Sequence, residues 1–385
     1  MANMYYEFFC PTKIMAGHAA LEHLPFELET LGVKRPMLVT SPNAHKNFIN
    51  HTFDSTQSQI VCTFDQVPAD SSLETVQQVA QLYRQHHCDA ILAVGGGSVI
   101  DTAKAANILV SEGGNDLLVY SGAHNLPKAL KPLLVIPTTS GTGSEVTMVT
   151  VVANNNTKIA FASRYLMPNA TILDARMTQT LPAHLTALTA MDALTHAIEA
   201  YTCLAANPIS DAYATAAIQK ISTHLFKVLE NPKDLDARLE LAQAATMAGI
   251  AFSNSMVGLV HALGHALGAV AHLPHGLCMS LFLPYVLEYN QSSRIADLLL
   301  PLAGAEIYAQ TPVEHRAEQT INTLFAIRDR LFEQTQLPRT LRETQKVSKS
   351  QFEEIAEKAL NDGSIIYNPK ETSLDDLYQI LEKVW

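Results

Sequence analysis

The sequence has no surplus of positive charge. Its 385 residues carry 26 lysines and arginines against 37 aspartates and glutamates, for a net charge of −11, and no basic cluster stands out. Nucleic acid and anionic membranes attract clustered basic side chains, so neither is expected as the main partner. Any phosphate that the chain binds must be held by backbone N–H groups and local charges.

Cysteine is scarce and scattered. The five cysteines are odd in number and form no CxxC pair, which argues against a disulfide framework and a thiolate zinc site. The N-terminal segment lacks the basic-then-apolar order of a signal peptide. Two apolar stretches, 90–110 and 257–287, carry glycines with charged residues or histidines, so neither indicates a membrane span. We expect a cytoplasmic protein.

Length and periodicity indicate two domains. A chain of 385 residues is too long for one hydrophobic core. Up to residue 182, short apolar runs alternate with helical patterns such as Leu73–His87, which predicts an α/β domain (1–182) with a parallel sheet. The predicted strands are Pro36–Thr40, Gln59–Phe64, Ala90–Val94, Leu133–Ile136 and Ala170–Leu173.

Helical periodicity dominates the second predicted domain (183–385). The predicted helices are Leu185–Ala205, Pro208–Leu229, Leu235–Ser253, Val257–Val270, Thr311–Thr335, Lys349–Asn361 and Leu374–Val384.

Two loops of unusual composition follow predicted strands. Gly95-Gly96-Gly97-Ser98 precedes a helix, whose free N–H groups and positive end favour a phosphate. It fits neither GxGxxG nor the P-loop, and an ordinary strand–helix turn is the alternative. Residues 138–144 hold three threonines, two serines and two glycines, a dense set of donors that can wrap a diphosphate. Two such loops favour a dinucleotide over a Ser/Thr-rich surface loop.

Four histidines, His261, His265, His272 and His275, lie within the apolar run VHALGHALGAVAHLPHG. Four buried imidazoles need partners, and hydrogen-bonded core histidines are the alternative to a binding site. Along one helix His261 and His275 would stand about 21 Å apart, so the chain must turn back for both to meet one ion. We expect a helix with His261 and His265, and a loop that returns with His275.

A second pair lies upstream. Asp192 and His196, in MDALTHAIEAY, are four residues apart and share one helix face. The alternative is a surface hydrogen bond, with Glu199 a surface acid. One Asp with several His suits Fe²⁺ or Zn²⁺ with a position open for substrate. Beside a dinucleotide, such a metal predicts hydride transfer to or from an alcohol.

These segments resemble the iron-containing (group III) alcohol dehydrogenase family. The similar segments are GGGSVIDTAK (95–104), PTTSGTGSEVT (137–147), MDALTHAIEAY (191–201), VHALGHALG (260–268) and LPHG (273–276). The resemblance spans essentially the whole chain. It implies an α/β dinucleotide-binding domain followed by an all-helical metal-binding domain, an architecture shared with dehydroquinate synthases, and a homodimer or larger assembly.

The resemblance also implies roles for individual residues. The metal ligands would be Asp192, His196, His261 and His275, with Fe²⁺ favoured over Zn²⁺, and His265 would relay a proton. His272 matches no ligand and is interpreted as structural or as lining a cleft. NAD(P) contacts would fall on Gly96, Gly97, Ser98, Asp101, Thr138, Thr139, Thr142 and Lys158. By alignment, the substrate pocket would be lined by Val149, Phe252, Val257 and Ser364, mostly apolar residues that favour a small or medium primary alcohol or its aldehyde.

One position departs from the family pattern. Where many NAD-preferring members carry an Asp for the adenosine ribose, this chain has Ser41. An Asp would repel a 2′-phosphate, whereas Ser41 can donate to it, and Lys46 and His45 are near in sequence. We therefore expect that NADP(H) is accepted as well as NAD.

Three other functions share parts of this pattern. A glycerol dehydrogenase would use the same chemistry on a polyol, but it matches SEVT and VHALGHALG less well. A dehydroquinate synthase-like lyase needs several Lys and Arg around the metal, and the stretches 192–201 and 252–276 contain none. A non-catalytic metal- or nucleotide-binding protein fits poorly, because all four ligands and both loops are present.

Overall fold

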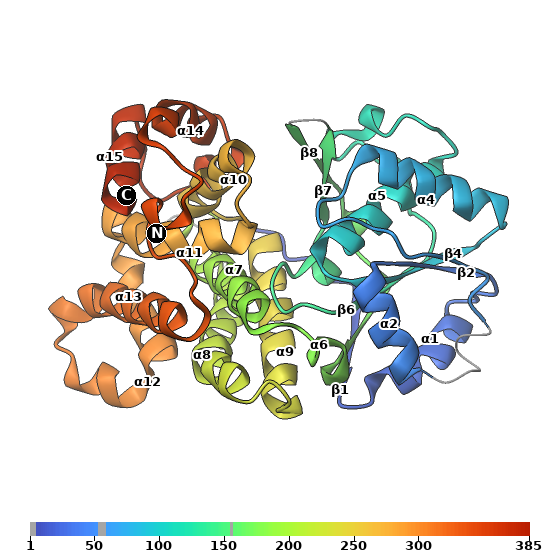
Figure 1. Ribbon diagram of the computed structural model, residues 1–385, viewed down its shortest axis with the longest axis horizontal. Helices are drawn as coiled ribbons and strands as arrows, with labels where there is room; N and C mark the ends of the chain where they lie inside the picture. Colours follow the sequence, from blue (N-terminus) through green and yellow to red (C-terminus); the bar gives the residue numbers. More distant parts are fainter. Residues whose placement is uncertain (1–4, 53–58, 155–156) are drawn as a thin grey trace. The chain divides into compact units, whose positions relative to one another are not determined.

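The computed structural model describes residues 5–52, 59–154 and 157–385. Internal contacts divide the chain into two units, each described by itself (Figure 1). The α/β unit comprises Phe9–Leu181 and Lys233–Thr246, and the helical unit comprises Pro182–Pro232 and Met247–Trp385 with the N-terminal segment up to Phe8. Segment 233–246 thus groups with the α/β unit by contacts, although it lies beyond the predicted boundary at 182/183. As a division into functional domains, 1–182 and 183–385 stays a prediction.

A six-stranded sheet forms the centre of the α/β unit. Its order is β1-β9-β6-β4-β2-β3, and every neighbouring pair is parallel. Every residue of β2, β4, β6 and β9 is buried, as near-continuous apolar runs predict for strands covered on both faces. The bounds are β1 (Lys13–Gly17), β2 (Pro36–Thr40), β3 (Cys62–Phe64), β4 (Ala90–Gly95), β6 (Leu133–Pro137) and β9 (Ala170–Asp174).

Helices cover both faces of this sheet. Met37 packs in one core with α4 (Leu73–Gln85) and α5 (Gly97–Glu112), whereas its neighbour Leu38 packs in the other core with α1, α2 and α6. This follows from the two-residue period of a strand, which points successive side chains to opposite faces. The second set is α1 (Leu24–Thr30), α2 (Pro42–His51) and α6 (Ala175–Thr178).

A smaller sheet, which the sequence did not predict, flanks the large one. Strands β7 (Val149–Asn154) and β8 (Thr157–Ala162) form an antiparallel hairpin, and β5 (Gly122–Ala123) pairs with β8. Strand β1 was also missed. Its apolar run, Ile14–Ala16, is only three residues long, shorter than the runs that predict buried strands, and its residues are exposed or half-buried.

The helical unit is built around α7 (Ala183–Thr202), which is buried on nearly all sides. Helices α8 and α11 pack on α7, and α10 packs on α11 and α14. Three predictions were wrong in detail. His275 is the first residue of a helix, not part of a loop, and the helices predicted from Thr311 and Lys349 begin at Arg316 and Phe352. The remaining bounds are α8 (Pro208–Glu230), α9 (Leu235–Ser253), α10 (Leu259–Ala271), α11 (His275–Asn290), α12 (Leu299–Gln310), α13 (Arg316–Thr335), α14 (Phe352–Leu360) and α15 (Leu374–Val384).

Among the described residues, no helix combines the length and the apolar character needed to cross a bilayer.

Candidate functional site

Four predicted ligands meet in the helical unit. Asp192 and His196 lie one turn apart on α7, His261 lies on α10, and His275 begins α11. Each offers one ligand atom, and these atoms all lie within 4.8 Å of one another. The structure therefore brings Asp192 and His275, which are 83 positions apart in the sequence, to the same site.

Two glycines allow this convergence. A Cβ on Gly276 would lie 2.1 Å from the carbonyl oxygen of Leu188, so only glycine lets α11 approach the backbone of α7 here. Leu188 is one turn before Asp192, and the contact sets His275 against that carboxylate. A Cβ on Gly264 would lie 1.9 Å from the Met279 side chain, so α10 and α11 also pack closely. His272 is exposed and ends α10 in the left-handed conformation (φ 51°), a structural role.

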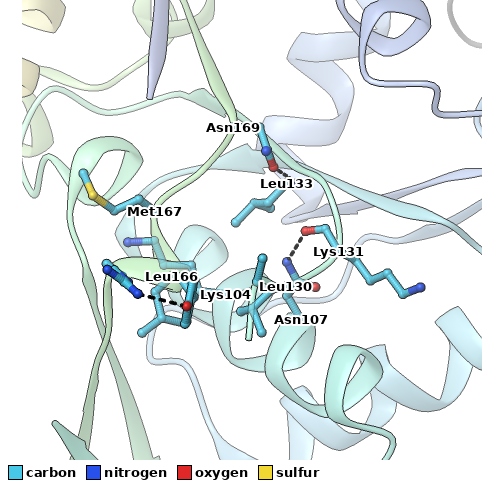
Figure 2. Close-up of a pocket in the computed structure, with 11 residues that line it drawn as sticks. Lys104, Asn107, Leu130, Lys131, Leu133, Leu166, Met167 and Asn169 are labelled. Atoms are coloured by element: carbon cyan, nitrogen blue, oxygen red, sulfur yellow. Dashed lines mark hydrogen bonds between the residues drawn. The ribbon is translucent and has the colours of Figure 1, made fainter. Parts of the chain in front are cut away.

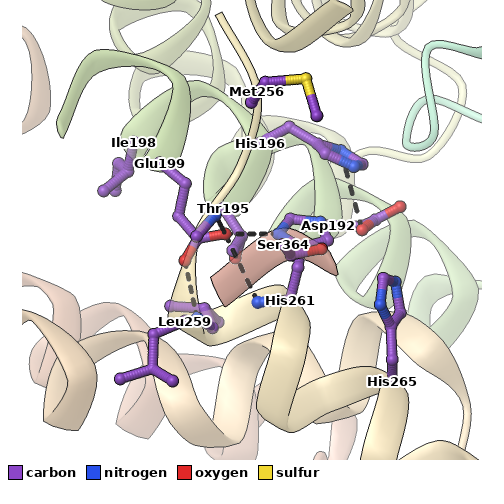
Figure 3. Close-up of polar contacts among 12 residues, drawn as sticks. Asp192, Thr195, His196, Ile198, Glu199, Met256, Leu259, His261, His265 and Ser364 are labelled. Atoms are coloured by element: carbon purple, nitrogen blue, oxygen red, sulfur yellow. Dashed lines mark hydrogen bonds and ion pairs between the residues drawn. The ribbon is translucent and has the colours of Figure 1, made fainter. Parts of the chain in front are cut away.

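Three of the four converging residues are buried and have a side-chain atom without a hydrogen bond, whereas His275 is half-buried. Among the described residues, Oδ1 of Asp192, Nδ1 of His196 and Nε2 of His261 find no partner of acceptable geometry. Oδ1 of Asp192 lies 3.2 Å from Nε2 of His275. It lies 3.7 Å from Nδ1 of His196 (Figure 3). Leaving a buried polar atom unpaired costs about 1–3 kcal/mol, and a cation would satisfy all of them at once. The donor set, one carboxylate oxygen and three imidazole nitrogens, fits a divalent first-row metal.

Burial sets the charge states that such an ion requires. It lowers the pKa of His196 to about 3 and the pKa of His261 well below its usual range, so both rings are neutral at pH 7. Burial by itself would raise the pKa of Asp192, but the imidazoles of His196 and His275 outweigh it and hold that pKa well below its usual range. Neutral imidazoles and an ionised carboxylate are the forms that bind metal.

Glu199 is not a surface acid; its carboxylate is buried and holds His261 in place. Oε2 accepts from Nδ1 of His261 at 2.5 Å and from the N–H of Gly258 at 3.0 Å, and Oε1 accepts from the N–H of Val260 at 2.6 Å. Burial raises the pKa of Glu199 to about 7, although the hydrogen bonds from these N–H groups lower it in part. The carboxylate caps the first turn of α10 and leaves Nε2 of His261 without a hydrogen bond to any described residue, as a metal ligand would require. A signal existed in the sequence, since 192, 196 and 199 share one helix face.

His265 stands beside the four converging residues. Its ring stacks on His275 with centroids 5.4 Å apart, and its Nδ1 lies 2.9 Å from Oδ2 of Asp362. Asp362 was not singled out from the sequence. Its position before Gly363-Ser364, at the start of a 3₁₀ turn (Gly363–Tyr367), is a helix-cap signal that could have drawn attention to it.

The predicted pocket residues are divided between the units. Phe252 stacks on His196 with ring centroids 4.2 Å apart, and Val257 is half-buried in the segment before α10. Ser364 lies in the 3₁₀ turn (Gly363–Tyr367) that packs on α10, the helix of His261 and His265 (Figure 3). Val149 belongs to the α/β unit, where it begins β7. Met256, which the sequence did not indicate, has a φ of 94° and stands beside His196 in Figure 3. A non-glycine residue at such a φ is strained.

In the α/β unit, three loops meet at one edge of the sheet. Strands β2, β4 and β6 are neighbours and parallel, so Ser41, the Gly96–Ser98 turn and the loop 138–144 follow their carboxyl ends together. A Cβ on Gly97 would lie 2.7 Å from the Thr142 side chain, and one on Gly96 would lie 3.1 Å from Thr139, so glycine permits the two loops to touch. Parallel sheets bind ligands at this edge.

The remaining cofactor candidates lie at the hairpin. Oδ2 of Asp101 on α5 accepts from the N–H of Val151 on β7, and burial raises the pKa of this carboxyl to about 6. Lys158 is exposed on β8. Lys104, which the sequence did not single out, is fully buried and donates to the carbonyls of Thr147 and Val149.

A cavity of about 130 Å³ lies elsewhere in the α/β unit (Figure 2). Leu133 and Asn169, which stand at or before the first residues of β6 and β9, place it at the amino edge of the sheet. The Asn107 amide donates to the carbonyl of Lys131, and the Asn169 side chain accepts from the N–H of Leu133. The side-chain amides of both asparagines thus already form hydrogen bonds within the protein. None of the residues that line the cavity is a predicted site residue.

Family models match both parts of the chain. The model described as iron-containing alcohol dehydrogenase matches residues 11–175, and the one described as the C-terminal part of the Fe-containing alcohol dehydrogenase family matches residues 186–385.

Individual relatives match over nearly the whole length. The NAD-dependent methanol dehydrogenase of Bacillus methanolicus is 32% identical, with 97% of this chain and 98% of the relative covered. The NADPH-dependent butanol dehydrogenase of Clostridium saccharobutylicum is 33% identical, with 98% and 97% covered. The solved structure of an alcohol dehydrogenase from Oenococcus oeni has a TM-score of 0.93 and 30% identity, with 99% of this chain and 100% of that chain covered.

Proposed function

The chain belongs to the iron-containing alcohol dehydrogenase family, and on that premise we propose how its residues interconvert an alcohol and its aldehyde. The protein is an NAD(P)-linked, metal-dependent oxidoreductase that acts on a small or medium primary alcohol. The proposal for its site is carried by one observation: four ligand atoms converge within 4.8 Å, and three of them are buried without a hydrogen bond.

Asp192, His196, His261 and His275 are the proposed metal ligands. When bound, a divalent cation supplies Lewis acidity to the substrate oxygen, and the nicotinamide ring accepts or returns a hydride. The ionised Asp192 would neutralise part of the cation's charge, and Glu199 fixes the tautomer of His261 so that Nε2 would be available to it. Phe252, stacked on His196, gives the alcohol carbon an apolar wall and limits water at the site.

His265 is the proposed proton carrier. Because its Nδ1 is held by Asp362, Nε2 is the ring atom that can accept the hydroxyl proton of the alcohol and later release it to solvent. The carbon-bound hydrogen would leave as hydride, and bound NAD(P) would take up both electrons of the oxidation.

The cofactor is proposed to lie along the three loops at the carboxyl edge of the sheet. The N-terminus of α5 and the donors of 138–144 would hold its diphosphate, with Asp101 and Lys158 near the hairpin. The hydroxyl of Ser41 does not cap α2. A 2′-phosphate would meet no carboxylate at that position, which supports acceptance of NADP(H).

We also propose a cytoplasmic homodimer or larger assembly. All five cysteines are free, as suits a reducing compartment, and β1 is an edge strand on which Ile14 is exposed. Light scattering should give a mass well above the 42.0 kDa of one chain, and a monomer at working concentration would refute the assembly. Fractionation of the native cells tests the compartment.

Paired variants test the site. His261→Ala should lose the metal and nearly all activity, because it removes a ligand. His265→Ala should keep the metal and lose rate, about 10²-fold or more, with a changed pH profile. Metal analysis and steady-state kinetics on both variants are sufficient. Loss of metal from His265→Ala would show that its role is wrongly assigned.

A further inference from the structure

Asp362 joins two parts of the proposed site. Its Oδ2 lies 2.9 Å from Nδ1 of His265, and its Oδ1 accepts from the N–H of Ser364 at 2.8 Å. Its own N–H donates to the carbonyl of Ala359 at the end of α14. Both carboxylate oxygens are therefore engaged, one on the histidine and one on the turn that carries Ser364.

These bonds restrict His265 in two ways. An ionised carboxylate only accepts hydrogen bonds, so Nδ1 must carry the proton and Nε2 must present its lone pair. The bond also fixes the ring, which is 39% exposed and would otherwise be free to turn. Its neighbours are proposed ligands, with ring centroids 5.4 Å away at His275 and 5.8 Å away at His261. Even so, His265 is not one of the four residues whose ligand atoms converge.

We propose that Asp362 is a positioning residue that fixes the Nδ1–H tautomer of His265 and aims Nε2 at the substrate beside Ser364. This inference rests on the proposed function, because it needs His265 as the proton carrier. A purely structural role is the competing explanation, since Asp362 also caps the 3₁₀ turn that begins at Gly363.

Asp362→Asn separates the two explanations. Asparagine caps helices as well as aspartate does, so the turn should be kept. With its oxygen on the N–H of Ser364, the asparagine amide turns its NH₂ toward Nδ1, which must then accept, and the proton moves to Nε2. The wrong ring nitrogen is then protonated. We expect kcat to fall about 10²-fold or more while the KM for alcohol, the metal content and the melting temperature change little.

Asp362→Ser is a second cap variant. Serine also caps well but is too short to reach His265, so kcat should fall in this variant too. If Asp362 served only as a cap, both variants would keep wild-type kcat. The matched control is Asp376→Asn. Asp376 accepts from the N–H and hydroxyl of Ser373 at the start of α15, and we expect unchanged kcat there.

The tautomer can be observed without turnover. Nitrogen-15 spectra of zinc-loaded protein with labelled histidine should show the proton of His265 on Nδ1 in the wild type and on Nε2 in Asp362→Asn. An unchanged tautomer, or wild-type kcat in both cap variants while His265→Ala is slow, would overturn the inference. Wild-type kcat in His265→Ala itself would instead refute the proton-carrier role, so the two failures are distinguishable.

Discussion

Glu199→Gln tests the support of the metal centre most directly. Glutamine has the shape of glutamate, but one acceptor oxygen becomes an NH₂ donor. The least disruptive placement keeps the amide oxygen at the Oε2 position, on Nδ1 of His261 and the N–H of Gly258. The NH₂ then faces the N–H of Val260, which is 2.6 Å from Oε1 in the wild type. At least one buried donor therefore loses its acceptor.

The magnitudes follow from these contacts. One buried donor without an acceptor costs about 1–3 kcal/mol of stability. The remaining bond to His261 changes from charged to neutral, which roughly halves its strength. Loss of such a carboxylate behind a histidine ligand weakens metal binding about 10–100-fold, or about 1.4–2.8 kcal/mol. We expect the lower end for Glu199→Gln, because one bond to His261 survives.

The assay is competition for metal against a chromophoric chelator, combined with urea unfolding of the metal-free protein. The matched control is Glu230→Gln, where an exposed glutamate pairs with Arg330 and the change should cost at most about 1 kcal/mol. Metal affinity within twofold of the wild type in Glu199→Gln would refute the claim that this carboxylate orients His261. A loss of stability without a loss of metal affinity would show that Glu199 serves only as a cap of α10.

Three further outcomes are expected. Ser41→Asp should lower kcat/KM for NADP relative to NAD by at least about 10-fold, because the carboxylate repels a 2′-phosphate; an unchanged ratio in initial-rate kinetics would contradict this. Met256→Gly should raise the free energy of unfolding by about 1 kcal/mol, because glycine relieves the strain at φ 94°, and a loss of stability in urea would refute it. Burial lowers the pKa of Lys104 to about 8 from 10.5, so between these values the unfolded chain holds more protons and wild-type stability should rise with pH. Lys104→Met should lack that rise, and the same dependence of melting temperature on pH in both proteins would contradict the assignment.

Much of the fold could be predicted because local sequence patterns indicate the central strands and most of the helices. Strands β2, β4, β6 and β9 are buried on both faces, and each was recognised as a short apolar run bounded by turn residues. Strand β1 was missed because its apolar run, Ile14–Ala16, is only three residues long, whereas β7 carries a β-branched run, Val149–Val152, that predicts a strand and was overlooked. The chain does turn back between His265 and His275, as expected, but the returning segment is a helix that begins at His275, directly after Pro274 at its N-cap.

Part of the site could also be predicted from local sequence periodicity. Spacings of four on α7 and α10 marked the faces that carry Asp192, His196 and His261. Asp362 lies 97 positions from His265, and Glu199 lies 62 from His261, so no local period links either pair. These two carboxylates could be assigned only after the helices were packed together.

The sequence by itself determined the central buried strands and most of the helices, which loops follow those strands, and which residue types could bind a cofactor and a metal. Tertiary structure decided which of the four histidines converge with Asp192, which one pairs with a separate carboxylate, and which acids are buried behind a histidine. The physical reason is range. Backbone periodicity and turn chemistry act over a few residues, whereas Gly276 against Leu188, Glu199 against His261 and Asp362 against His265 are contacts between distant segments whose geometry exists only once the helices are packed.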